Sequence, residues 1–139
     1  AMEALEQMAI SHLAQKPYTR ISTGELQQVS IARAIAQKAR LIMMDEPTAH
    51  LDYGNQLKVL RLIKDLSAKG YAVVITTHNP DQVLLLDAKT AIIDQRSAFH
   101  FGPWQDIFTE ELLSAMYGVP LRIIKVEGID RMVSVAPEL

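Results

Sequence analysis

Two short apolar runs constrain the fold of this chain more than any other feature. Leu41 to Met44 is uninterrupted and ends abruptly in polar residues, and Tyr71 to Thr77 is a second run of this kind. Continuous apolar strands of this length are typical of parallel sheets, whose two faces are both buried. Helical patterns precede and follow both runs, and the alternation of helices with short buried strands predicts an α/β fold.

The helical patterns lie over residues 2–14, 25–39 and 53–69, where apolar side chains recur at helical spacing. Asn79-Pro80 resembles a helix cap followed by proline at the first helical position, and it predicts a short helix to about Leu86. Beyond that, we expect a hairpin over 91–101 around Gln95-Arg96, a helix over 103–117, and a second hairpin from 122–126 and 131–135. The end of the chain is therefore expected to be a small α+β region.

Composition narrows the class of protein. The chain has 139 residues, of which 49% are hydrophobic and 22% charged, as expected for one globular domain. Its net charge of −2 gives no basic excess, so we expect no nucleic-acid partner. The absence of cysteine excludes disulfides, thiolate zinc sites and cysteine nucleophiles. The longest apolar runs are too short to span a bilayer.

Asp45-Glu46 is the strongest local candidate for chemistry, because it directly follows the first strand. Ligands of open α/β sheets bind beyond the carboxyl ends of the strands. Two adjacent carboxylates at such a place can hold a cation and polarise a water molecule. A strand end that merely reaches solvent explains the dipeptide equally well. His78 follows the second strand, and we expect it at the same edge of the sheet.

Ser22-Thr23-Gly24-Glu25 precedes the second helical pattern. Ser22 and Glu25 have the spacing of a capping box, in which each side chain bonds to the other residue's backbone. The start of a helix also attracts anions, and Gly24 would let a phosphate approach closely. Both interpretations are compatible with the residues.

Taken in order, these segments resemble the ATPases of ABC transporters. Residues 21–28 are similar to the signature motif, 41–46 to the Walker B strand, 47–52 to the D-loop, and 76–79 to the switch-histidine loop. More loosely, residues 101–103, Thr109-Glu110 and the last hairpin are similar to ATPases of iron-chelate, haem, cobalamin and metal-oxyanion importers. The resemblance implies the C-terminal part of a P-loop NTPase core, with parallel strands flanked by helices and a C-terminal hairpin region. It divides the chain into the rest of a helical subdomain (1–40), part of the ATPase core (41–102) and an appendage (103–139).

The resemblance also implies roles for individual residues. Asp45 would support Mg²⁺ on the nucleotide, Glu46 would be the general base for water, and His78 would contact the γ-phosphate. Asp52 would act across a dimer interface. The signature residues Ser22, Gly24 and Glu25 would bind ATP held by a second subunit, and Thr23 stands where the family usually has glycine.

The partners implied are a second ATPase subunit in a head-to-tail dimer and transmembrane permease subunits, with peripheral attachment to the cytoplasmic face of the membrane. The cofactors implied are ATP and Mg²⁺, and the activity implied is ATP hydrolysis coupled to transport. Two alternatives remain: a truncated chain without catalysis, and an ABC ATPase outside transport that acts on nucleic acid.

One family element is absent from the sequence. No G-x-x-x-x-G-K-[ST] pattern occurs among its 139 residues. The isolated chain is therefore expected to be inactive. In the family, the strand before that loop lies between the strand ending at His78 and the strand near 91–94. Without it we expect the chain to pair strand edges with another copy, as a non-native homo-oligomer, or to close the gap internally.

Overall fold

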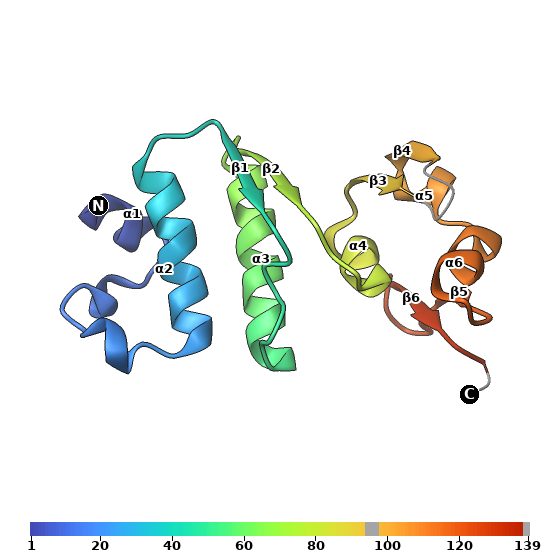
Figure 1. Cartoon of the computed structure of the whole chain (residues 1–139), viewed down its shortest axis with the longest axis horizontal. Helices are drawn as coiled ribbons and strands as arrows, with labels where there is room; N and C mark the ends of the chain where they lie inside the picture. The colour runs from blue at the N-terminus through green and yellow to red at the C-terminus, as the bar shows by residue number, and fades with distance from the viewer. Residues whose placement is uncertain (94–97, 138–139) are drawn as a thin grey trace. The chain divides into compact units, whose positions relative to one another are not determined.

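The computed structural model describes residues 1–93 and 98–137, and the chain divides into two compact units, Ala1–His78 and Asn79–Leu139 (Figure 1). The first unit contains, in chain order, α1 (Met2–Gln7), η1 (Ser11–Leu13), η2 (Tyr18–Arg20), α2 (Thr23–Ala36), β1 (Leu41–Met44), α3 (Tyr53–Ala68) and β2 (Ala72–Ile75). The second contains α4 (Pro80–Leu86), β3 (Lys89–Ile93), β4 (Phe99–Pro103), α5 (Trp104–Ile107), α6 (Glu110–Tyr117), β5 (Arg122–Lys125) and β6 (Met132–Val135). The expected division at residues 40 and 102 stays a prediction.

The strand pairing confirms the α/β class. β1 and β2 run parallel, with Leu41 opposite Ala72 and Met44 opposite Ile75. β3 pairs with β4 and β5 with β6, both antiparallel, as the two expected hairpins require. The expected turn at residues 95 and 96 lies outside the described residues. In the described part of the chain, each sheet has two strands, so the expected internal closure of the sheet is not found there.

Two of the predicted helices are interrupted. The pattern over 2–14 forms α1 and then η1, because Ala9 has a φ of +56° and cannot continue the helix. The bend directs Ile10 into the core, where its exposed fraction is 3%. The pattern over 103–117 forms α5 and α6, because Phe108 leaves the helical conformation and Thr109 Oγ1 caps α6 by accepting from the Leu112 N–H at 3.1 Å.

The observed bounds of the other predicted helices are close to those expected from the sequence. α2 and α3 lie within two or three residues of their expected bounds. α4 begins at Pro80, and the Asn79 side chain caps it by accepting from the Asp81 N–H at 2.9 Å. In the part of the chain that is described, no helix is both long and apolar enough to cross a bilayer.

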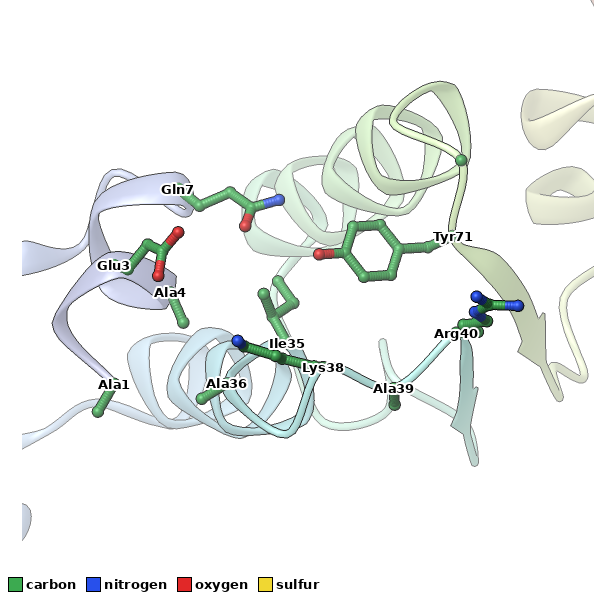
Figure 2. A pocket seen from close by; sticks show the side chains of 11 residues that line it. Ala1, Glu3, Ala4, Gln7, Ile35, Ala36, Lys38, Ala39, Arg40 and Tyr71 are labelled. Atoms are coloured by element: carbon green, nitrogen blue, oxygen red, sulfur yellow. The ribbon is translucent and has the colours of Figure 1, made fainter.

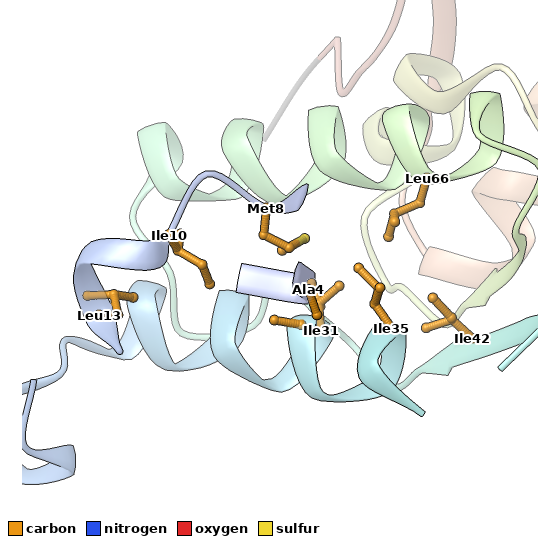
Figure 3. Close-up of a cluster of buried hydrophobic side chains, with 9 residues drawn as sticks. Ala4, Met8, Ile10, Leu13, Ile31, Ile35, Ile42 and Leu66 are labelled. Carbon is orange, nitrogen blue, oxygen red and sulfur yellow. The ribbon is translucent and has the colours of Figure 1, made fainter. Parts of the chain in front are cut away.

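Each unit has its own hydrophobic core. The core of the first unit is built from the segment around α1 and η1 together with α2, β1 and α3 (Figure 3). Its buried residues are Ala4, Met8, Ile10, Leu13, Ile31, Ala32, Ile35, Ile42 and Leu66. The second unit is built around Leu84, Ile92, Phe108 and Leu113. The first core holds one face of β1 against the helices and so positions the end of the strand, where the polar residues begin.

Candidate nucleotide site

The carboxyl ends of β1 and β2 bring Asp45, Glu46 and Thr76 together. Because Met44 lies opposite Ile75 in the parallel register, the next residues of both strands leave the sheet at the same edge. The Thr76 hydroxyl donates to Asp45 Oδ1 and accepts from the Glu46 N–H at 2.9 Å. A single hydroxyl therefore fixes the Asp45 carboxylate and the backbone of Glu46 in one arrangement.

Sequence reasoning did not assign this role to Thr76. The available signal was its position: it is the first residue after the second strand, as Asp45 is after the first. Recognising it required the strand register, which places the two ends side by side, and the sequence did not specify that register.

Glu46 has an unusual backbone conformation. Its φ is +42°, in the left-handed region that side-chain-bearing residues seldom adopt, and it precedes Pro47. Its carboxylate Oε1 lies 2.7 Å from His78 Nε2. Both side chains are accessible, at 44% for Glu46 and 87% for His78, and the pair is ionic only when the histidine is protonated. Strained residues concentrate at functional sites, and here the strain accompanies a cluster of polar groups.

The first residues of α2 form the expected capping box. The Ser22 N–H donates to Glu25 Oε2 at 2.8 Å, and Ser22 Oγ accepts from the Glu25 N–H at 3.3 Å. Lys16 Nζ donates to both carboxylate oxygens of Glu25 at 2.8 Å. The hydrogen bonds from Lys16 and then from Ser22 lower the pKa of Glu25 from 4.5 to about 2. The Glu25 carboxylate is therefore already paired with Lys16, a cation of the same chain.

Asp52 caps α3 and holds Asn55, which lies against the start of α2. Its Oδ1 accepts from the Asn55 N–H at 2.9 Å and its Oδ2 from Asn55 Nδ2 at 2.6 Å. These hydrogen bonds from Asn55 lower the pKa of Asp52. A Cβ on Gly24 would lie 3.2 Å from Asn55 Cγ, so the start of α2 rests against the side chain that Asp52 holds. Asn55 is a second residue that sequence reasoning missed.

The candidate residues thus form two groups in the first unit. Asp45, Glu46 and His78 are gathered at the strand ends. Ser22, Gly24 and Asp52 are gathered at the starts of α2 and α3. Within the described residues, no hydrogen bond or ion pair joins Ser22 or Glu25 to Asp45 or Glu46.

One surface hollow lies away from both groups. It has a volume of about 350 Å³ and is lined by α1, the end of α2 and the residues before β1 and β2. In Figure 2 the Gln7 amide and the Tyr71 hydroxyl point toward one another across it. Arg40 lines this hollow and directly precedes β1, whereas Asp45 directly follows β1. The hollow and the strand-end cluster are therefore at opposite ends of that strand. A smaller hollow of about 210 Å³ reaches Asp45 from between α2 and β1.

Known proteins are similar to this chain in sequence and in fold. The ABC transporter family matches residues 1–49. An ABC transporter ATP-binding protein of Haemophilus influenzae is 46% identical over 117 residues, which are 84% of this chain and 44% of that protein. The molybdate import ATP-binding protein MolC of the same organism is 42% identical over 122 residues, which are 87% of this chain and 48% of MolC. A solved structure described as a metal-chelate type ABC transporter in an inward-facing conformation matches with a TM-score of 0.90 at 36% identity, covering 99% of this chain and 55% of that one.

The chain therefore belongs to the ATP-binding proteins of ABC transporters. It spans about half the length of the curated relatives that it matches. The similarity to the solved structure extends over nearly the whole chain, including the second unit, for which the sequence motifs were less specific. The family and the fold class expected from the sequence are confirmed.

Proposed function

We propose that this chain is part of the ATP-binding subunit of an importer for a metal chelate or a related metal compound, and that its strand-end cluster takes part in ATP hydrolysis. The observation that supports this function is the arrangement of Asp45, Thr76, Glu46 and His78 at the ends of two parallel strands. The importer class is supported by the molybdate importer and the metal-chelate type transporter among the similar proteins.

Asp45 is the residue proposed to hold Mg²⁺. In nucleotide sites Mg²⁺ uses one or two carboxylates together with phosphate oxygens and water. One accessible carboxylate, fixed in place by a hydroxyl, fits this requirement. No group of three candidate ligand side chains exists among the described residues, so the phosphates and water would complete the coordination. The ion would neutralise charge on the phosphates during transfer.

Glu46 is the proposed general base and His78 the proposed γ-phosphate contact. The Thr76 hydroxyl fixes the backbone of Glu46, and His78 Nε2 lies within hydrogen-bond distance of its carboxylate. A carboxylate held in this way can orient a water molecule and accept its proton as the water attacks phosphorus. The exposed pair is weak, so a bound phosphate can draw His78 away from Glu46.

Ser22, Gly24 and Glu25 are proposed to contact ATP held by a second subunit, and Asp52 is proposed to act across that interface. The capping box at the start of α2 and the approach of Gly24 to Asn55 support this assignment to a head-to-tail dimer, because the start of a helix attracts phosphate. Lys16 neutralises Glu25, so the carboxylate repels a nearby phosphate less than a free one would. The transmembrane permease subunits would then hold the assembly at the cytoplasmic face of the membrane.

Hydrolysis needs a phosphate loop, and no such pattern occurs in these 139 residues. We therefore assign turnover to a longer protein that supplies the loop, and we expect the chain alone to be inactive. The alternative is a chain that never takes part in catalysis, and the same missing pattern favours it. Hydrolysis by a longer form that contains a phosphate loop, and its dependence on Glu46, distinguishes these two possibilities.

The first experiment is a titration of the 139-residue chain with a fluorescent ATP analogue and Mg²⁺. We expect no saturable binding by the chain alone. Tight binding would show that the chain builds a nucleotide site without a phosphate loop and would contradict this account.

The second experiment places Glu46→Gln in a full-length form that contains a phosphate loop. We expect hydrolysis to be abolished and ATP binding to be kept, because the amide cannot accept the proton while the phosphate contacts remain. Loss of ATP binding in this variant, or normal hydrolysis, would contradict the role of Glu46.

A further inference from the structure

The Thr76 hydroxyl engages only one of the two oxygens of the Asp45 carboxylate. It donates to Asp45 Oδ1 and accepts from the Glu46 N–H at 2.9 Å. These directions are fixed, because a backbone N–H can only donate and an ionised carboxylate can only accept. No hydrogen bond from the residues that the structure describes reaches Asp45 Oδ2. The exposed carboxylate therefore has one oxygen held by Thr76 and a second oxygen that remains accessible.

The position of this hydroxyl is set by the backbone of two paired strands. Thr76 directly follows β2, and its N–H donates at 3.0 Å to the carbonyl of Met44, the last residue of β1. Asp45 is the next residue, so the hydroxyl and the carboxylate start from neighbouring backbone positions. The β-branched side chain of threonine also has few rotamers at χ1. The bond to one carboxylate oxygen is thus a consequence of the fold and not of a freely rotating side chain.

The number of carboxylate oxygens available affects which divalent cation such a residue binds. Ca²⁺ takes about six to eight oxygen ligands in a flexible geometry and often binds both oxygens of one carboxylate. Mg²⁺ is smaller, requires a nearly octahedral arrangement, and uses carboxylates together with phosphate oxygens and water. A carboxylate with one oxygen held by a hydroxyl offers only its other oxygen, either to the cation or to a water molecule bound to it.

We propose that Thr76 is a positioning residue that sets the metal specificity of the nucleotide site: by holding Asp45 Oδ1 it opposes bidentate binding of a cation and so favours Mg²⁺ over Ca²⁺. The inference rests on the proposed function, in which Asp45 holds Mg²⁺. The neighbouring carboxylate of Glu46 does not replace the engaged oxygen, because its Oε1 lies 2.7 Å from His78 Nε2. Thr76 therefore adds a selectivity that the Asp45 carboxylate alone does not provide.

The test measures equilibrium binding in the longer form that contains a phosphate loop. A fluorescent, non-hydrolysable ATP analogue is titrated into the protein with saturating Mg²⁺ and, separately, with saturating Ca²⁺. The selectivity is the dissociation constant with Ca²⁺ divided by the dissociation constant with Mg²⁺. Because no hydrolysis takes place, the result does not depend on the role of Glu46 as general base.

Thr76→Val removes the hydroxyl and keeps the shape of the side chain. We expect its selectivity for Mg²⁺ to fall by about threefold or more, a change of the size produced by one hydrogen bond. Thr76→Ser keeps the hydroxyl and should have the selectivity of the wild type. Thr19→Val is the matched control, since Thr19 is an exposed threonine of the same unit that lies outside the candidate site. It should also behave as the wild type does.

Three results would overturn the proposal. Thr76→Val could have the same selectivity as the wild type, it could bind the analogue more weakly with both cations by the same factor, or Thr76→Ser could lose the selectivity as well. Asp45→Asn distinguishes this failure from a failure of the proposed function. If Asp45→Asn weakens binding with Mg²⁺ while Thr76→Val keeps the selectivity, only the inference about Thr76 is wrong. If Asp45→Asn binds as the wild type does, the assignment of Mg²⁺ to Asp45 is wrong, and the inference is overturned with it.

Discussion

Replacing Leu66 by alanine tests the packing of the first unit most directly. Leu66 lies in α3 with an exposed fraction of 1% and belongs to the cluster that contains Ile35 and Ile42. Alanine maintains the helix, because it has at least the helix propensity of leucine. The backbone carbonyl of residue 66 can still accept from the Tyr71 N–H, a bond of 3.2 Å. The cost therefore comes from lost burial and from the cavity, about 3–5 kcal/mol for a fully buried leucine.

This cost is large beside the stability of the unit. We expect the free energy of unfolding of Ala1–His78 to be about 4–12 kcal/mol, since folded proteins are stable by about 0.05–0.15 kcal/mol per residue. If the free energy of unfolding falls by about 2 kcal/mol per molar urea, the urea concentration at the midpoint of unfolding should be lower in Leu66→Ala by at least about 1.5 M. Urea denaturation followed by circular dichroism measures this shift. The matched control is Lys64→Ala on the exposed side of α3, which should stay within about 0.5 kcal/mol of the wild type. A loss below about 1 kcal/mol in Leu66→Ala would refute the packing described here.

Glu25 and Thr76 give two further predictions. The folded pKa of Glu25 is depressed to about 2, so its contribution to stability is present above pH 4.5 and is lost as the pH falls toward 2. Glu25→Gln should remove that part of the acid dependence of the melting temperature, and an unchanged acid dependence would contradict the pair with Lys16. Thr76→Val should speed hydrogen exchange of the Glu46 amide by roughly two- to tenfold, since the hydroxyl that accepts from it is lost. Equal exchange rates would show that water replaces the hydroxyl fully.

Much of the fold could be predicted because the decisive signals are local. The bounds of β1 follow from a continuous apolar run that ends in two carboxylates, and the start of α4 follows from Asn79-Pro80. The interruptions at Ala9 and Phe108 could not be predicted from spacing. The helical pattern continues through both positions, and each break directs a large side chain, Ile10 or Phe108 itself, into a core assembled from distant segments.

The residues of the candidate site could likewise be predicted only where the signal is local in the sequence. The sequence predicted that Asp45, Glu46 and His78 lie at one edge, because strand ends in a parallel sheet converge, and the distance between Glu46 and His78 agrees. Thr76 and Asn55 were missed because their roles depend on register and on the approach of two helices, which no local pattern encodes.

The disagreement between sequence and structure at β1 has a physical meaning of its own. The sequence predicts burial on both faces, since no polar residue interrupts Leu41 to Met44. The structure buries Ile42 and exposes Met43. A strand composed for two buried faces is favoured only where both faces lose contact with water, because exposed methionine and leucine gain nothing from folding. At Met43 the sequence therefore predicted a burial that the structure does not show, whereas the opposite face of β1, at Ile42, is buried as expected.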